Sequence, residues 1–148
     1  MSEDNKSVKK VHLRVLTPKA TKVDETVDMV IMRCTNGDMG VLPGHETHLC
    51  VLADGVLRMM QGRRERRVAV FGGVAEVRDD QVSILTEEAY WPHEIDSKQV
   101  EQERDDLQRK LQEEKDEAGD QNNQALLKRA LIKIEVSEYS EAHEADEE

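Results

Sequence analysis

The first part of the chain consists of short apolar runs separated by turn residues. Residues 11–15 alternate apolar and polar side chains with a period of two, as a half-buried strand does. In residues 27–34, apolar side chains occupy both odd-numbered and even-numbered positions, which predicts a longer strand. Strands this short and regular predict an antiparallel β-sandwich or barrel. The remaining apolar runs occupy residues 49–52, 56–60, 67–71, 74–77 and 82–85, with breaks at 54–55, 61–62, 72–73 and 79–80.

The pattern changes after Pro92, where helical spacing replaces the short apolar runs. Asp96 can cap a first helix, because Gln99 stands three residues later in a capping-box arrangement. The narrow apolar stripe of this helix consists of Val100, Leu107, Leu111 and Ala118.

A second helix is predicted after the polar segment 119–123, which is expected to break the helical run. Together the two helices predict an antiparallel hairpin after the sandwich. Because the hairpin contains few apolar residues, its burial should barely offset the ordering entropy, so it should be mobile or depend on another surface. The apolar face of the second helix consists of Leu127, Ala130, Leu131 and Ile134.

Charge divides the chain and excludes one class of function. The formal net charge is −11, which argues against nucleic-acid binding, because phosphates are held by clustered Lys and Arg. The basic cluster 63–67 predicts a solvated hairpin tip or a rim contact with an acidic partner. Residues 138–148 are strongly acidic and predict a disordered tail. The predicted organisation is a sandwich domain over 1–92, a helical hairpin over 93–137 and this tail.

Neither the N-terminal residues nor the cysteines indicate a secreted or membrane-anchored protein. Residues 1–10 carry charge but no apolar run. We therefore expect them to form neither a signal peptide nor a membrane anchor. Cys34 and Cys50 do not make a secreted disulfide framework. We therefore expect a cytosolic protein, or one held at a membrane only through partners.

No motif predicts catalytic, cofactor-binding or metal-binding residues. Residues 45–48, His-Glu-Thr-His, are one residue short of the helical zinc motif, and Pro43-Gly44 before them opposes a helix. Phosphate-binding loops and nucleophile elbows are absent from the sequence. A metal site that includes these histidines is conceivable, although it would lack the usual Cys-x-x-Cys spacing. A polar loop between strands is the simpler interpretation of residues 45–48. The ligands of the metal site would be Cys34, His45, His48 and Cys50.

One segment carries a family resemblance. Residues 37–45, Gly-Asp-Met-Gly-Val-Leu-Pro-Gly-His, resemble the Gly-x-Leu-Gly-Ile-Leu-Pro-Gly-His signature of the epsilon subunit of F-type ATP synthases. Residues 54–58 resemble that family's next glycine turn, and residues 68–77 its Gly-Gly-x-x-Glu-Val strand pair. The resemblance covers about residues 8–137. It implies a ten-stranded β-sandwich followed by two helices.

The resemblance implies a non-catalytic subunit of the central rotor stalk, which couples ion flow through the membrane ring to ATP synthesis from ADP and phosphate. Its partners would be the gamma subunit, the c-subunit ring and the alpha/beta catalytic hexamer, at the cytoplasmic face of the cell membrane. Carried over position by position, Asp38 and His45 would contact the ring, and Met39, Pro43 and Gly44 would shape the contacting loop.

The resemblance also implies a regulatory hairpin, which in bacterial relatives either folds against the sandwich or extends into the catalytic hexamer and blocks ATP hydrolysis. Lys128, Arg129 and Lys133 could then meet an acidic loop of the beta subunits. Relatives that bind ATP here carry Ile/Leu-Asp-x-x-Arg-Ala at the start of the first helix. This chain has Gln99 and Val100 in the last two positions, so we expect ATP to bind weakly or not at all.

Two other hypotheses compete with the rotor subunit. The first is a free-standing β-sandwich with a coiled-coil arm that acts as an interaction or assembly module. The second is a small metalloenzyme that uses His45 and His48. Co-purification with gamma and the hexamer would separate the rotor subunit from the free module, and metal analysis would test the metalloenzyme.

Overall fold

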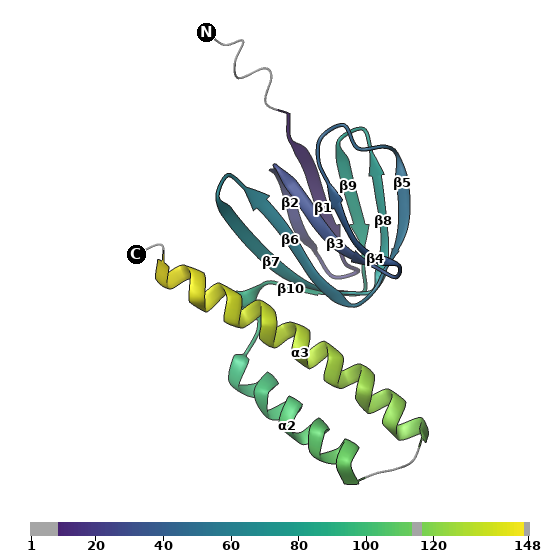
Figure 1. Ribbon diagram of the computed structural model, residues 1–148, viewed down its shortest axis with the longest axis vertical. Helices are drawn as coiled ribbons and strands as arrows, with labels where there is room; N and C mark the ends of the chain where they lie inside the picture. The colour runs from purple at the N-terminus through teal and green to yellow at the C-terminus, as the bar shows by residue number, and fades with distance from the viewer. Residues whose placement is uncertain (1–8, 114–116, 147–148) are drawn as a thin grey trace.

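The computed structural model describes residues 9–113 and 117–146, which form a β-sandwich followed by two helices (Figure 1). A short 3-10 helix, η1 (Pro92–Glu94), leads from the sandwich to α2 (Ser97–Glu113) and α3 (Glu117–Asp146). The predicted fold class is confirmed. The ten strands are β1 (Val11–Leu16), β2 (Thr21–Val27), β3 (Met29–Cys34), β4 (Gly37–Val41), β5 (His48–Leu52), β6 (Gly55–Gln61), β7 (Arg64–Phe71), β8 (Gly73–Arg78), β9 (Gln81–Leu85) and β10 (Glu88–Tyr90).

A single sheet of ten strands curls on itself to make the sandwich. Its hydrogen-bonded order is β10-β7-β6-β3-β5-β8-β9-β1-β2, and β4 pairs with β3 off this path. The curl brings β1 against β3 and β2 against β6, which encloses the core (Figure 1). The pairs in the described residues are antiparallel except β1 with β9, which is parallel.

Alternation directs one apolar face of each strand into this core, and β7 is the exception that positions the helices. Val68 and Val70 of β7 face the main core, as the period of two requires. The residues between and after them, Ala69 and Phe71, are also buried, but against α3. β7 is therefore covered on both faces, and its outer face is the surface on which the hairpin rests.

Four strand predictions change in the structure, one of them because the short strand β10 lies outside the predicted apolar runs. The expected long strand 27–34 is interrupted at Asp28, which separates β2 from β3. Strands β2 and β4 are not predicted by the pattern, because charged residues and glycines leave them little apolar alternation. They form because β1 and β3 offer each of them a complete antiparallel ladder.

The paired glycines 72–73 allow β8 to approach β9 closely. Gly73 has a φ of +114°, and a Cβ at this position would lie 2.1 Å from the carbonyl oxygen of Leu85. Only glycine combines this backbone conformation with so close a contact. The Gly-Gly pattern noted in the sequence is thus a packing requirement of the sheet.

Helix α3 is longer than the sequence pattern predicts. Residues 119–123, expected to break the helical run, lie inside α3 instead. The expected disordered tail is helical over 138–146, whereas residues 147–148 lie outside the described residues. Tyr139 helps to hold this extension, because its ring stacks on His143 and lies 3.8 Å from the guanidinium of Arg67.

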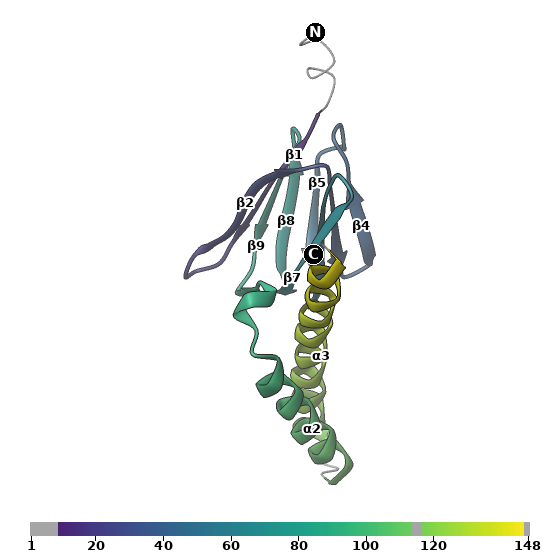
Figure 2. The same cartoon turned by 90° about the vertical axis from the view of Figure 1, so that its left-hand side faces the viewer.

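The two helices lie side by side and extend from one end of the sandwich (Figure 2). The predicted cap is confirmed: the Gln99 amide donates to the Asp96 carboxylate over 3.3 Å. In the part of the chain that the structure describes, no helix is long and apolar enough to cross a membrane.

Removal of residues 97–148 should leave a sandwich that still melts cooperatively, because its main core is built from strand residues alone. The truncation uncovers Ala69 and Phe71, so we expect a lower melting temperature and moderate binding of an apolar dye. Thermal unfolding with dye binding measures both. A non-cooperative melt would show that the helices complete the main core, and Phe71→Ser in the truncated chain should reduce the dye signal.

Candidate functional site

The interface between α3 and the sandwich is one candidate functional region. Ile132 and Val136 of α3 are buried against Ala69 and Phe71 of β7. Val136 is 0% exposed, so this contact excludes water. The hairpin therefore depends on the sandwich surface, as one of the two sequence-based expectations proposed.

A second face of α3 packs on α2. Ala130 and Ile134 are buried with Val100, and Ile95 lies between this cluster and the one on β7. Leu131, predicted to share this face, is 45% exposed instead. Helical geometry explains the error, because residues 130 and 134 face α2, residues 132 and 136 face the sandwich, and residue 131 projects away from both.

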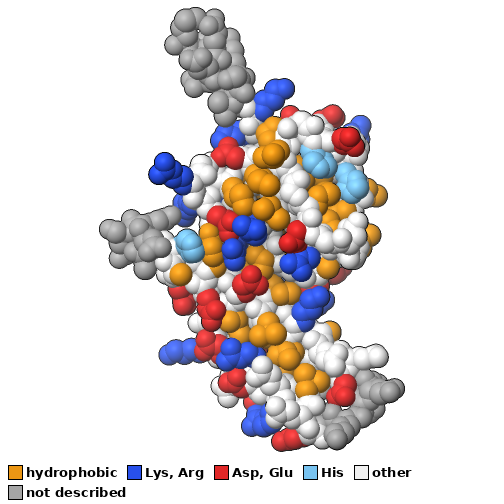
Figure 3. All heavy atoms as spheres, viewed as in Figure 1, with side chains coloured by type: hydrophobic (Ala, Val, Ile, Leu, Met, Phe, Trp, Pro, Cys, Tyr) orange, Lys and Arg blue, Asp and Glu red, His pale blue; other side chains and the backbone are white. Residues whose placement is uncertain are grey.

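Two of the three predicted hexamer contacts are engaged within the chain. The Nε of Arg129 donates to Asp54 over 2.9 Å, and its Nη1 donates to Glu88 over 3.4 Å. The ammonium of Lys133 lies 4.6 Å from the ring centroid of Tyr90. Lys128 is exposed. Arg129 and Lys133 thus hold the hairpin down, and acidic and basic side chains mix where the helices meet the sandwich (Figure 3).

A charged cluster on β6 and β7 supports the last turns of α3. Glu65 accepts hydrogen bonds from Arg58 at 2.6 Å and from Arg67 at 2.7 Å. Burial alone would raise the pKa of Glu65, but these two hydrogen bonds, together with the charges of the two arginines, outweigh it and lower that pKa. The stabilisation is present above the unfolded pKa and is lost as pH falls through the lowered folded value. Arg63 and Arg64 are exposed at the turn between β6 and β7, as the predicted solvated tip requires. Only Glu65 and Arg67 of the basic segment 63–67 belong to this packed cluster.

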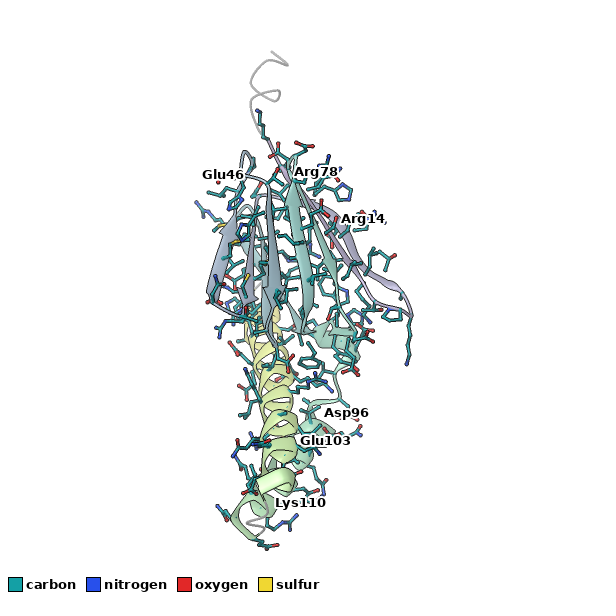
Figure 4. The ribbon with its side chains drawn as sticks, turned by 90° about the vertical axis from the view of Figure 1, so that its right-hand side faces the viewer. Arg14, Glu46, Arg78, Asp96, Glu103 and Lys110 are labelled. Carbon is teal, nitrogen blue, oxygen red and sulfur yellow. The ribbon has the colours of Figure 1, made fainter. Side chains whose placement is uncertain are left out.

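A pocket of about 450 Å³ lies between the two helices and the sandwich. Three carboxylates and three basic side chains line it, so its formal charge does not favour a polyanion. Glu103 and Lys110 mark the α2 wall of this pocket in Figure 4. The lining residues are Phe71, Glu88, Glu103, Asp106, Leu107, Lys110, Leu126, Arg129, Ala130 and Lys133.

ATP should bind to the isolated chain with millimolar affinity or weaker. Arg129 is already paired with carboxylates, and Gln99 replaces the arginine of nucleotide-binding relatives, so a charge-assisted phosphate contact is missing. Calorimetric titration measures this affinity. Glu103→Gln with Asp106→Asn removes two acids from the pocket and should strengthen any binding. A micromolar site in the unaltered chain would contradict the prediction.

The signature segment does not form one loop. Asp38 and Met39 lie in β4, and the Asp38 carboxylate pairs with Arg33. Pro43, Gly44 and His45 follow β4 at its other end, where the Gly44 amide donates to the carboxylate of Asp80 over 2.6 Å. Figure 4 places the neighbouring Glu46 at the end of the sandwich remote from the helices. The five predicted contact residues therefore span the length of an edge strand.

An exposed apolar row crosses β5, β8 and β9 on the outside of the sheet. Val51 pairs with Val74, and Val74 pairs with Leu85, which makes the row continuous. A solvated apolar row of this kind marks an interaction surface. The sequence indicates this row at residues 49–52, where apolar side chains occupy successive positions and therefore both faces of the strand. The outer apolar row consists of Leu49, Val51, Val74 and Leu85, which are 70%, 58%, 41% and 53% exposed.

The conceivable metal site does not assemble. The thiols of Cys34 and Cys50 meet inside the sandwich, whereas His48 is exposed and the Nδ1 of His45 lies 2.8 Å from the carbonyl oxygen of Glu46. In residues 9–113 and 117–146, no three histidine, cysteine or acidic side chains are grouped to hold a metal ion.

Comparison with known proteins relates both parts of the chain to one enzyme. The family described as "ATP synthase, Delta/Epsilon chain, beta-sandwich domain" matches residues 10–92. The ATP synthase epsilon chain of Syntrophobacter fumaroxidans is 39% identical over 129 residues, covering 87% of this chain and 96% of the relative. That of Bacillus subtilis is 34% identical over 110 residues, covering 74% and 83%.

Solved structures agree with these relatives. A chain of the Euglena gracilis mitochondrial ATP synthase, in a structure of its OSCP, F1 and c-ring, superposes with a TM-score of 0.64 at 29% identity, covering 90% of this chain and 81% of that one. A chain of the Tetrahymena thermophila central stalk and c-ring superposes with a TM-score of 0.55 at 15% identity, covering 87% and 97%. The second likeness concerns the fold alone.

Proposed function

We propose how this chain holds its partners. The chain belongs to the family of ATP synthase delta/epsilon chains and is a non-catalytic subunit of the central stalk. The sandwich binds the gamma subunit, the β4 edge faces the c-subunit ring, and the hairpin is a brake that can be released. In this position, at the cytoplasmic face of the membrane, the chain couples ion flow to ATP synthesis. The observation that carries the proposal is the outer apolar row.

The outer apolar row suits a stable protein interface. Its side chains project from three paired strands, so the surface is rigid before binding. The main core is complete without it, so the row is not needed for folding. The gamma subunit is the occupant we assign, because a rotor subunit must be held firmly on the shaft that turns with it.

Gel filtration of this chain with purified gamma subunit tests the assignment. We expect an equimolar complex with the full chain and also with a truncation before Ser97, because the row lies on the sandwich. Separate elution of both proteins would contradict the proposal. It would favour the alternative of a free-standing interaction module, although the match to epsilon chains through the hairpin argues against that alternative.

The β4 edge is the surface we assign to the ring. Asp38 is exposed at one end of the strand and His45 is half-buried just beyond the other, while Pro43 and Gly44 shape the turn between His45 and the strand. Met39, half-buried between them, packs on the main core and fixes the strand in place. The edge presents one polar side chain near each end, Asp38 and His45, to the polar loops of the ring.

Cysteine cross-linking in the assembled complex tests the ring contact. Asp38→Cys and His45→Cys should each form disulfides with cysteines placed in the polar loops of the c subunits. Arg14→Cys, on the exposed side of β1 (Figure 4), is the control and should form none. Cross-linking at neither position 38 nor position 45 would overturn the assignment of this edge.

The hairpin acts as a brake only after it leaves the sandwich. In the docked conformation Arg129 and Lys133 face carboxylates and aromatic rings of the sandwich, whereas Lys128 is exposed. Undocking frees the two engaged cations to meet an acidic surface of the catalytic hexamer. Because the docking contact is small, a change in rotor state can shift the population between the two positions.

A further inference from the structure

Cys34 and Cys50 meet inside the sandwich, on the opposite face of the sheet from the outer apolar row. They are 3% and 8% exposed, on β3 and β5. Their sulfur atoms lie 2.9 Å apart, and neither is in a disulfide. Since a disulfide bond is about 2.05 Å long, an approach of roughly 0.9 Å would close one.

The two strands that carry these thiols are joined by a very short ladder. Cys34 pairs with Leu52, the single register pair between β3 and β5. Cys50 is two residues from Leu52, so both thiols project from the same face of the sheet. Backbone hydrogen bonds of 3.0 Å flank the pair, from Thr35 to Val51 and from Ala53 to Arg33. A junction with so few hydrogen bonds opens locally more easily than a long ladder and can admit a small oxidant.

We propose that Cys34 and Cys50 form a modification site that a small hydroperoxide oxidises to a reversible intramolecular disulfide. The first thiol loses its proton, and its sulfur takes the terminal oxygen as the O–O bond breaks, giving a sulfenic acid and an alcohol or water. The second sulfur then displaces the hydroxyl group, which leaves as water with the proton of the second thiol. Two electrons pass from the thiols to the peroxide.

Burial sets the conditions under which this bond forms. Burial raises the pKa of the Cys50 thiol to about 12, with a further contribution from the adjacent Cys34 thiol. At neutral pH the Cys50 thiol is therefore protonated and oxidises slowly. In a reducing cytosol it stays reduced, and the disulfide marks oxidative stress.

The disulfide would enclose the segment between the two cysteines, which contains β4 and the Pro-Gly turn. Closing a loop of this length restricts the unfolded chain and stabilises the folded one. Oxidation would thus fix β5 against β3, the strand that pairs with β4, the edge we assign to the ring. This consequence for the ring contact rests on the proposed function, whereas formation of the bond does not.

Hydrogen peroxide treatment of the full chain tests the inference. We expect both thiols to disappear together, with a loss of two hydrogen atoms in the intact mass and no change in monomer size. The melting temperature should rise by about 5 °C or more, and dithiothreitol should reverse it. Cys34→Ala and Cys50→Ala, each treated in the same way, should show no rise.

Three results would overturn the inference. They are oxygen adducts on separate cysteines, disulfide-linked dimers, and thiols that survive peroxide in the folded chain. A disulfide that formed but left the melting temperature unchanged would overturn the expected stabilisation of the folded chain. Because these readouts use the isolated chain, they are independent of whether it binds gamma or the ring.

Discussion

Val51→Glu weakens binding of the chain to the gamma subunit by about 100-fold or more, because burying an unpaired carboxylate in an apolar interface costs several kcal/mol. Val51 lies at the centre of the outer apolar row and is 58% exposed in the free chain. The substitution should therefore leave the melting temperature of the isolated chain nearly unchanged. Titration of labelled chain with purified gamma measures the affinity.

A matched control separates the row from general effects of added charge. Leu131→Glu introduces the same side chain at an exposed leucine of α3, which is 45% exposed and far from the row in the fold. It should bind gamma as the unaltered chain does. Equal affinity of the Val51 and Leu131 variants would show that gamma does not occupy the outer apolar row.

Val136→Asp releases the hairpin from the sandwich, with a loss of docking free energy of about 3 kcal/mol or more. The carboxylate would replace an apolar side chain that is 0% exposed between α3 and β7. The sandwich should stay folded, because its main core does not include this residue. Proteases should then cut the hairpin at least tenfold faster, a change that limited proteolysis detects.

ATP hydrolysis by the assembled complex shows what the released hairpin does. If release sets the brake, the Val136→Asp complex hydrolyses ATP more slowly than wild type. Adding charge reversals at Lys128, Arg129 and Lys133 should restore the rate, most clearly at low ionic strength. Unchanged hydrolysis in the Val136→Asp complex, despite faster proteolysis, would mean that the hairpin is no brake.

Reversing the charges of Lys128, Arg129 and Lys133 without the Val136→Asp substitution is a less direct test of the brake. Reversal of Arg129 breaks its ion pairs with Asp54 and Glu88, so it undocks the helix while it weakens any contact with the hexamer. The two effects oppose each other in the rate of hydrolysis. In the Val136→Asp background the hairpin is already released, and only the second effect remains.

Periodicity predicts the parts of this fold that local sequence determines. Strand β1 alternates strictly, and its pattern of burial follows. The Asp96 cap also follows from residue type and spacing, because a side-chain oxygen within reach of free helix amides is a local feature. Gly37 and Gly44 of the signature have positive φ angles, but residue type alone did not show that a strand, β4, occupies half of the segment.

The remaining features depend on tertiary contacts that spacing cannot reveal. Residues 119–123 have poor helix propensity, yet they are helical because α3 packs on α2 and the sandwich over its later turns. The direction of Arg129 depends on carboxylates 41 and 75 residues away. The meeting of Cys34 and Cys50 likewise follows from the pairing of β3 with β5, which their spacing along the chain does not specify.

Purification of the chain with an affinity tag from the membranes of its own cells tests the central claim most directly. The account predicts that gamma, the catalytic alpha and beta subunits and the c-subunit ring elute with it in fixed proportion, and that Val51→Glu abolishes this association. Recovery of the chain by itself, from cells whose ATP synthase purifies intact without it, would contradict the account.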